Sequence, residues 1–162
     1  MKDCRIVSLY SGSGGNSTFI RIGDTAILID AGKSARALCK ALCDIGESIE
    51  SISAIFITHE HTDHISALEV LTKKHPMPIH ITEGSVEKIY ARCAEHLLSC
   101  LVVERTEFSV ELEDVRVSSF RTPHDSRMSV GYRIEFFDGE QKRAIGFATD
   151  IGYISDEIRE NL

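Results

Sequence analysis

The sequence has no long hydrophobic run and no secretion signal. Its longest apolar stretches, such as 54–57, have the length of a strand, whereas roughly 18 apolar residues are needed to cross a bilayer. The N-terminus reads Met1-Lys2-Asp3-Cys4-Arg5 and lacks the apolar segment of a signal peptide. We therefore expect a cytoplasmic protein that does not enter a membrane.

The sequence also lacks the cysteine pattern of a disulfide-rich protein or a zinc ribbon. Its 5 cysteines are odd in number, and no pair has the C-x-x-C spacing. Cys39 and Cys43 lie four residues apart in a predicted helix, on or near its apolar face, where free thiols act as small hydrophobic groups. This usage argues against a disulfide framework and favours a reducing compartment.

Positive charge is in deficit. The chain has 18 Lys and Arg against 25 Asp and Glu, which gives a formal net charge of −7. That balance argues against a broad basic surface for nucleic acid, although bound metal ions would add positive charge that the sum leaves out. The length of 162 residues and the 43% hydrophobic content suffice for one packed domain, 1–162.

Residue patterns predict a mixed chain of strands and helices with no internal repeat or linker. Helices are predicted at 34–45, 63–74, 86–97 and from Ser155 onward. Strands are predicted at 5–9, 17–22, 26–29, 54–58, 78–82, 101–103, 115–121, 130–137 and 143–149. The helix at 86–97 has the clearest pattern, because one apolar stripe contains Val86, Ile89, Tyr90, Cys93 and Leu97. The acidic stretch 104–114 is expected to form a solvated loop and an edge strand.

One short segment concentrates metal-binding side chains. It reads Thr58-His59-Glu60-His61-Thr62-Asp63-His64, follows a predicted strand and leads into a helix. Imidazole and carboxylate groups suit Zn²⁺ and similar divalent ions. His59 and His61 point the same way in an extended stretch, and Asp63 and His64 then face a second position nearby. The alternative is a polar helix cap with Thr62 as N-cap, which leaves the histidines unexplained.

This H-x-H-x-D-H pattern resembles the signature of the metallo-β-lactamase superfamily. The resemblance continues in order along the chain, through the Asp-x-Gly ending of 27–32, His124 in 122–126 and Asp150 in 147–150. Within the superfamily, 9–18 and 149–156 resemble the WalJ/YycJ-type subgroup, cytosolic metallohydrolases associated with exonuclease action on double-stranded DNA. The resemblance implies an α+β fold, the metallo-β-lactamase-like αβ/βα sandwich.

The resemblance also implies two divalent metal ions, with Zn²⁺ first and Mn²⁺ as the alternative. The first ion would be held by His59, His61 and His124, the second by Asp63 and His64, and Asp150 would bridge the two. Paired ions lower the pKa of a shared water from about 15.7 toward about 7, and Asp63 would orient the resulting hydroxide as the catalytic residue. Asp30 is expected to support the ligands rather than to be one. No substrate-binding residue is predicted.

Other polar residues have simpler interpretations. His75, His80 and His96 are expected in loops or at the surface. The glycine-rich stretch 11–16 fits neither the Walker nor the dinucleotide-binding pattern, so a tight turn near the metal site is expected, with backbone N–H groups that could touch a substrate phosphate. The basic row at 33–40 is either a solvated face or a guide for a phosphate backbone.

The sequence departs from the subgroup in two ways. Ser126 follows His124-Asp125, where the subgroup usually has alanine, so the local loop and the substrate fit differ. The chain also ends at Leu162 inside a predicted helix, and it has no histidine after His124, whereas the second half of the family fold normally supplies a last ligand. We therefore expect a truncated sandwich whose uncovered sheet face is apolar and open to self-association.

Three functions remain open at this stage. The leading hypothesis is a metal-dependent hydrolase that cleaves phosphodiester bonds of DNA as an exonuclease. The second keeps the metal site but acts on a small molecule, a cyclic phosphodiester or a thioester, which suits the net acidity. The third is an inactive fragment that binds metal without turnover. Metal content and parallel assays on DNA and small esters separate the three.

Overall fold

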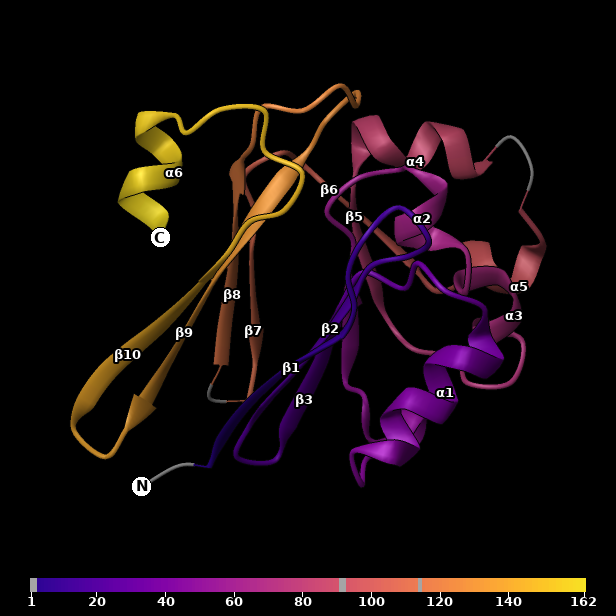
Figure 1. Cartoon of the computed structure of the whole chain (residues 1–162), viewed down its shortest axis with the longest axis horizontal. Coiled ribbons are helices and arrows are strands. Elements are labelled where there is room, and N and C mark those ends of the chain that lie inside the picture. Colours follow the sequence, from indigo (N-terminus) through magenta and orange to yellow (C-terminus); the bar gives the residue numbers. More distant parts are fainter. Residues whose placement is uncertain (1–2, 91–92, 114) are drawn as a thin grey trace.

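Two β-sheets pack face to face in the computed structural model, which describes residues 3–90, 93–113 and 115–162 (Figure 1). Helices cover the outer face of the larger sheet, and one short helix lies on the outer side of the smaller sheet. The arrangement is the α+β sandwich that the sequence predicts.

The larger sheet has 6 strands in the order β1-β2-β3-β4-β5-β6. The strands are β1 (Cys4–Tyr10), β2 (Ser17–Ile22), β3 (Thr25–Ile29), β4 (Ala54–Phe56), β5 (Ile79–Thr82) and β6 (Leu101–Glu104). The first three are antiparallel, whereas β3 to β6 run parallel because helical segments connect them. Every residue of β3 is buried, as expected for a strand that is covered on both faces.

The helical layer lies on one face of this sheet. It consists of α1 (Ala35–Asp44), the 3-10 helix η1 (Ile49–Ser51), α2 (Thr62–Ile65), α3 (Leu68–Thr72), α4 (Glu83–Tyr90) and α5 (Glu95–Leu98). Helix α1 begins after Ser34, whose hydroxyl accepts a hydrogen bond from the Ala37 N–H, and it ends just before Gly46, which confirms the predicted helix. No helix in the described ranges is long and apolar enough to span a membrane.

Two predicted helices are wrong in their continuity. The helix expected at 63–74 is divided into α2 and α3. The helix expected at 86–97 is divided into α4 and α5, because Ala94 has an extended backbone with φ −75° and ψ 155°, and 91–92 lie outside the described residues. The apolar stripe still identifies Val86, Ile89 and Leu97 as buried, whereas Tyr90 is 52% exposed.

The smaller sheet has 4 antiparallel strands in the order β10-β9-β8-β7. They are β7 (Ser109–Leu112), β8 (Val115–Arg121), β9 (Val130–Asp138) and β10 (Gln141–Phe147). The predicted edge strand within 104–114 is confirmed as β7; Asp114 lies outside the described residues. One hydrophobic core lies between the sheets and includes Ile20, Phe56, Val117, Tyr132 and Ile134. A second core joins the larger sheet to the helices.

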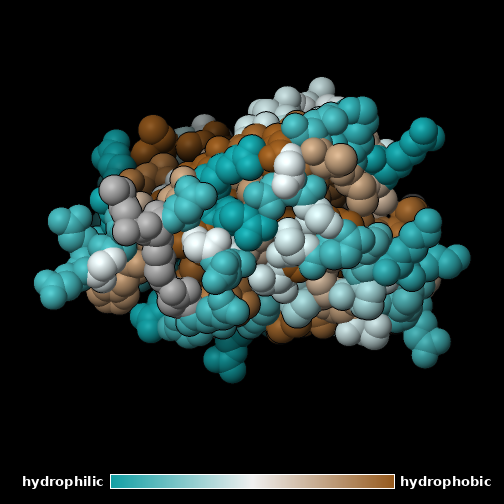
Figure 2. All heavy atoms as spheres, turned by 90° about the horizontal axis from the view of Figure 1, so that it is seen from below, coloured by the Kyte–Doolittle hydropathy of each residue, from teal (hydrophilic) through white to brown (hydrophobic). Residues whose placement is uncertain are grey.

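The outer face of the smaller sheet carries charged side chains together with Phe120, which is buried, and Phe137, which is 55% exposed. Alternation along β8 and β9 turns the core side chains inward and leaves Arg116, Arg133 and Glu135 outward. Glu135 pairs with Lys142 Nζ at 2.9 Å, and helix α6 (Asp156–Asn161) packs on β8 and β9. Figure 2 shows hydrophilic side chains spread over one side of the molecule, with smaller hydrophobic areas between them. Charged groups therefore interrupt the apolar surface expected on this face, and self-association through it stays a prediction.

Candidate metal centre

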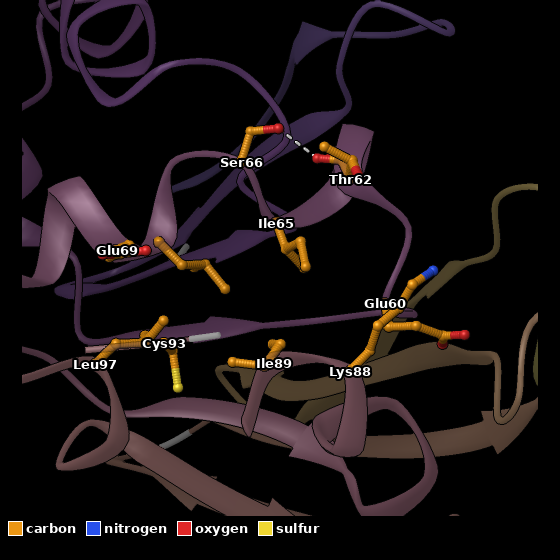
Figure 3. Close-up of a pocket in the computed structure, with 10 residues that line it drawn as sticks. Glu60, Thr62, Ile65, Ser66, Glu69, Lys88, Ile89, Cys93 and Leu97 are labelled. Atoms are coloured by element: carbon orange, nitrogen blue, oxygen red, sulfur yellow. Dashed lines mark hydrogen bonds between the residues drawn. The ribbon is translucent and has the colours of Figure 1, made fainter. Parts of the chain in front are cut away.

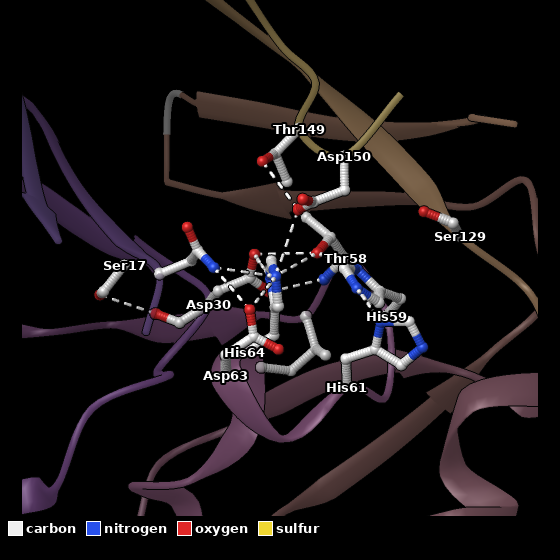
Figure 4. A network of polar contacts seen from close by, with 12 residues as sticks. Ser17, Asp30, Thr58, His59, His61, Asp63, His64, Ser129, Thr149 and Asp150 are labelled. Atoms are coloured by element: carbon white, nitrogen blue, oxygen red, sulfur yellow. Dashed lines mark hydrogen bonds and ion pairs between the residues drawn. The ribbon is translucent and has the colours of Figure 1, made fainter. Parts of the chain in front are cut away.

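The histidine-rich segment lies at the junction of the two sheets. It follows β4 and enters α2, and Asp30 follows the neighbouring parallel strand β3 at the same edge. His124 follows β8 and lies 3.3 Å from His61 through its Nε2 atom. Asp150 follows β10 and points toward His64 (Figure 4), so the smaller sheet contributes to the same place. The N-cap of α2 is His61 and not Thr62 as predicted, and it makes no side-chain capping bond.

Three imidazole nitrogens converge at this junction. His59 Nε2 lies 3.1 Å from His61 Nδ1, and His124 Nε2 lies 3.3 Å from the same atom. A tetrahedral ion with nitrogen ligands at roughly 2.0–2.1 Å separates two of those nitrogens by about 3.3 Å. The three histidines therefore have the spacing of a metal site, and a divalent ion held by them would keep one position open.

A second group of ligands lies beside the first and shares His59 with it. His59, His64 and Asp150 each offer a ligand atom, and these atoms lie within 4.8 Å of one another. Asp150 Oδ2 is 3.2 Å from His64 Nε2, and Asp63 Oδ2 is 3.6 Å from that nitrogen. The structure thus brings the six predicted ligands together. The second group contains His59 in place of Asp63, but His59 Nε2 already belongs to the first group. Asp63 therefore stays the predicted ligand of the second ion.

The carboxylate of Asp30 organises the histidines from inside the protein. It accepts hydrogen bonds from the N–H and the hydroxyl of Thr58 and from His64 Nδ1, each at 2.8 Å. With its proton on Nδ1, His64 presents the Nε2 lone pair to the cluster. The Thr58 hydroxyl also lies 3.0 Å from His59 Nδ1 and can accept its proton, which frees His59 Nε2 in the same way. Asp30 therefore occupies the position expected of a residue that supports ligands.

Burial and neighbouring charges shift the protonation of this network. Burial, followed by the charges of the neighbouring imidazoles, lowers the pKa of His59 from 6.5 to about 3. Burial also lowers the pKa of His64, but the hydrogen bond and charge of Asp30 outweigh it and raise the net value. Burial raises the pKa of Asp30, and the bonds from His64 and Thr58 counteract that rise. His59 is therefore a neutral imidazole near pH 7, the form that binds metal ions.

Two aspartates of the cluster have a left-handed backbone. Among the described non-glycine residues, positive φ occurs at Asp30 (63°), Asp150 (52°) and Glu113 (50°). Such a conformation costs on the order of 1–2 kcal/mol and persists where the surrounding structure enforces it. Both aspartates follow strand ends, and both carboxylates contact His64, one at each ring nitrogen. The strain is therefore concentrated at the cluster.

The glycine-rich turn after β1 packs directly against the histidine-rich segment. The Asn16 N–H donates to the Asp63 carbonyl at 2.7 Å, and the Gly32 N–H donates to the Asn16 carbonyl at 2.9 Å. A Cβ on Gly32 would lie 1.5 Å from the Asp63 carbonyl oxygen, so this approach requires glycine. The predicted tight turn beside the cluster is confirmed.

Glu60 has a structural role that the sequence analysis did not predict. It is 4% exposed and points away from the converging imidazoles. Its carboxylate accepts hydrogen bonds from the Arg127 N–H at 3.2 Å and from the Ser85 hydroxyl at 3.1 Å. Glu60 therefore joins the histidine-rich segment to the loop that follows His124 and to α4. The position of Glu60 between His59 and His61 was the one sequence feature that pointed to a role near the cluster.

The remaining histidines lie outside the cluster. His96 is half-buried and lies 2.8 Å from the Glu69 carbonyl oxygen, at the boundary of the surface. His80 is only 6% exposed, stacks on Phe56 with ring centroids 4.7 Å apart, and lies 3.0 Å from Glu104 Oε1. The predicted surface position of His80 is wrong, because β5 lies inside the sheet and is covered on both sides.

Two pockets flank the histidine-rich segment. One of about 480 Å³ lies on the helical side and is lined by apolar groups such as Ile65, Ile89 and Leu97, with Glu60 and Lys88 at one end (Figure 3). None of the six predicted ligands lines it. A smaller pocket of about 220 Å³ is lined by His124 and its neighbours in 121–129. Another pocket of about 340 Å³ is lined by Asn16, Asp30 and Thr149, so pockets border the cluster on more than one side.

Known proteins share this sequence pattern. A family model described as the β-lactamase superfamily domain matches residues 25–162. The chain is 31% identical over 156 residues to exodeoxyribonuclease YycJ of Bacillus anthracis and 30% identical over 155 residues to exodeoxyribonuclease WalJ of Streptococcus pneumoniae. Each match covers 93% of this chain but 56% and 55% of the relative, so the chain spans about half the length of these curated relatives.

Solved structures share the fold. The metallo-β-lactamase MIM-1 from Novosphingobium pentaromativorans matches with a TM-score of 0.67 and 19% sequence identity. The match covers 89% of this chain and 59% of that chain. At this identity the likeness concerns the fold, and it includes both sheets of the sandwich.

Proposed function

This chain belongs to the metallo-β-lactamase superfamily, and from that premise we propose that it is a metal-dependent hydrolase of phosphodiester bonds in DNA. The observation that carries the proposal is the convergence of His59, His61 and His124 at the spacing of metal ligands, beside His64 and Asp150. The two exodeoxyribonuclease relatives support DNA as the substrate class and an exonuclease mode of action.

The donor set fits two divalent ions side by side. His59, His61 and His124 would hold one, Asp63 and His64 would hold the other, and Asp150 would lie between them. Ions bound there would act as Lewis acids and would supply an activated water near neutral pH. Zn²⁺ suits the imidazole-rich donors best, and the carboxylates also admit Mn²⁺.

The protein's own side chains fix orientations and proton positions. Asp30 keeps the proton of His64 on Nδ1, and Thr58 does the same for His59. The side chain of Asp63 is about one-third exposed, so water can reach its carboxylate. Besides binding the second ion, this carboxylate would orient the attacking water as the catalytic base. The Thr149 hydroxyl donates to Asp150 Oδ2 at 2.9 Å and restrains that carboxylate.

We place the protein in the cytoplasm. All 5 cysteines are free thiols, which fits a reducing compartment. Cys100 is buried and Cys39 is partly buried, whereas Cys43 is exposed, so only Cys39 of the predicted helical pair packs against the core.

Two observations keep other functions in view. The net charge of −7 disfavours a long polyanion and favours a small phosphodiester or thioester as substrate. The chain spans about half the length of the exodeoxyribonuclease relatives, so turnover has to be tested separately from metal binding. Neither observation changes the ligand assignment, so the three functions differ in substrate and turnover.

Metal content and hydrolysis test the proposal together. The protein is loaded with Zn²⁺ or Mn²⁺, desalted and measured by elemental analysis, and it is then assayed on end-labelled duplex DNA, a small phosphodiester and a thioester. We expect about two ions per chain and release of nucleotides from DNA ends. His59→Ala and Asp63→Asn should abolish hydrolysis, whereas His75→Ala, a histidine outside the cluster, should match the wild type.

Each alternative has its own result. Less than about one ion per chain after reloading would refute the metal site. Hydrolysis of small esters without cleavage of DNA would establish the second function. Bound metal with no turnover on any substrate would establish the third.

A further inference from the structure

The side chain of Asn16 connects the glycine-rich turn to two predicted ligands. Its Oδ1 accepts a hydrogen bond from the Gly12 N–H at 3.0 Å, and its Nδ2 donates to the Gly12 carbonyl at 3.2 Å. The same Nδ2 donates to Asp63 Oδ2 at 3.0 Å and lies 3.1 Å from His64 Nε2. The Gly12 N–H requires an acceptor, so the amide has only one orientation, with its donor toward Asp63.

The contact with Asp63 has a consequence for metal binding. The Asn16 amide donates to Oδ2 of Asp63, the same oxygen that lies 3.6 Å from His64 Nε2. A carboxylate that accepts a hydrogen bond is restrained in rotation. His64 Nε2, the other ligand of the same predicted ion, lies within reach of the same amide.

We propose that Asn16 is a positioning residue, which holds Asp63 and His64 in the arrangement that binds the second metal ion. The inference rests on the proposed function, because it assumes an ion at that position. It extends the site to the turn after β1, a segment that supplies none of the predicted ligands.

The packing of the glycine-rich turn against the histidine-rich segment does not depend on the Asn16 side chain. The backbone of Asn16 bonds to the Asp63 carbonyl and to the Gly32 N–H, and both bonds survive a change of side chain. Loss of the amide therefore removes the contact with the carboxylate while the turn stays in place. A positioning role of Asn16 therefore predicts weaker metal binding without a loss of stability, whereas a general structural role predicts both.

Stepwise Zn²⁺ binding to Asn16→Ala tests the proposal. Zn²⁺ alone is titrated into the metal-free protein against a competing chelator, and the thermal midpoint of the metal-free protein is measured in parallel. We expect the second binding step to weaken by about 10–100-fold, while the first step and the midpoint stay as in the wild type. Ser13→Ala, an exposed residue of the same turn, is the matched control and should change neither step.

The outcomes separate this inference from the proposed function. Two unchanged steps in Asn16→Ala overturn the positioning role, as does an equal loss in both steps with a lower metal-free midpoint. If Asn16→Ala does not fold, Asn16→Ser keeps an acceptor near Gly12 but is too short to reach Asp63, and the same selective loss is expected. A single step in the wild type overturns this inference and the two-ion site together. Two steps without DNA cleavage overturn only the proposed substrate.

Discussion

Replacing Asp30 with asparagine isolates the effect of one buried negative charge on the cluster. Asp30 is 1% exposed and has positive φ, a backbone conformation that asparagine also adopts readily. The substitution therefore preserves shape and backbone strain. It replaces one carboxylate oxygen by an NH₂ group, which donates hydrogen bonds and cannot accept them.

The size of the expected loss of stability depends on which hydrogen bonds Asp30→Asn removes. Oδ1 accepts from the Thr58 N–H and can stay an acceptor, whereas Oδ2 accepts from both the Thr58 hydroxyl and His64 Nδ1. Hydrogen bonds to a charged group contribute about 1.5–3 kcal/mol each, and the hydroxyl can rotate to recover part of the loss. We expect Asp30→Asn to lower the free energy of unfolding by about 2–4 kcal/mol, which lowers the thermal midpoint by roughly 4–16 °C.

The same change acts on His64 directly. Its Nδ1 would face a donor, so its proton would move to Nε2, the nitrogen that the cluster needs unprotonated. We expect metal affinity to fall by about 10–100-fold. Urea unfolding of the metal-free protein and Zn²⁺ titration measure the two effects. Asp44→Asn, the same substitution in an exposed ion pair with Lys40, serves as control and should change neither. Wild-type stability together with wild-type affinity in Asp30→Asn would refute the reasoning.

Three further predictions concern the turn, the charged sheet face and the ions. Gly32→Ala places a Cβ against the Asp63 carbonyl and should cost more than about 3 kcal/mol in urea unfolding, whereas Gly152→Ala, with its nearest contact at 3.4 Å, should be tolerated. The hydrogen bond from Lys142 lowers the pKa of Glu135 below 4.5, so this carboxylate stabilises the fold above the unfolded pKa, and that stability is lost as pH falls through the folded pKa. Glu135→Gln should therefore lower the thermal midpoint slightly at pH 7 and not at pH 3, and an equal shift at both would contradict this. Bound metal at 100 times Kd adds about 2.7 kcal/mol to the free energy of unfolding, so chelation should remove that stabilisation and lower the thermal midpoint of the metal-loaded wild type. The midpoint of His59→Ala should stay unchanged, and equal shifts in both proteins would contradict the site.

Local patterns predicted most of the strands, helix α1 and the metal-binding character of the histidine-rich segment, whereas the resemblance to the family added His124 and Asp150. The locally predicted features depend on residues close in sequence, such as the apolar run of β3 or the alternation in the histidine-rich segment. The break between α4 and α5 escaped prediction, because an apolar stripe identifies a buried face and continues across a change of backbone. Spacing alone carries no information on where a helix stops.

Other parts of the site depend on contacts between distant segments. His80 looked like a surface residue because it closely follows Pro76 and Pro78. Its stacking on Phe56 and its contact with Glu104 follow from the position of β5 inside the sheet. The partners of Glu60 and the left-handed backbone at Asp30 and Asp150 likewise arise from tertiary packing. No local pattern encodes these features, because each depends on segments that meet only in the folded chain.

The cluster draws His124 and Asp150 from the smaller sheet and its other ligands from the larger one, so its geometry depends on how the sheets are held together. The Tyr132 hydroxyl donates to the Ile57 carbonyl at 2.5 Å, and the Val130 N–H donates to the Thr58 carbonyl at 3.0 Å. Both bonds join β9 to the segment just before His59. A change in the core between the sheets would therefore alter the distances between donors without touching any of them. Core residues such as Tyr132 are in this sense remote determinants of metal selectivity, and variation there can retune the chemistry while every ligand is retained.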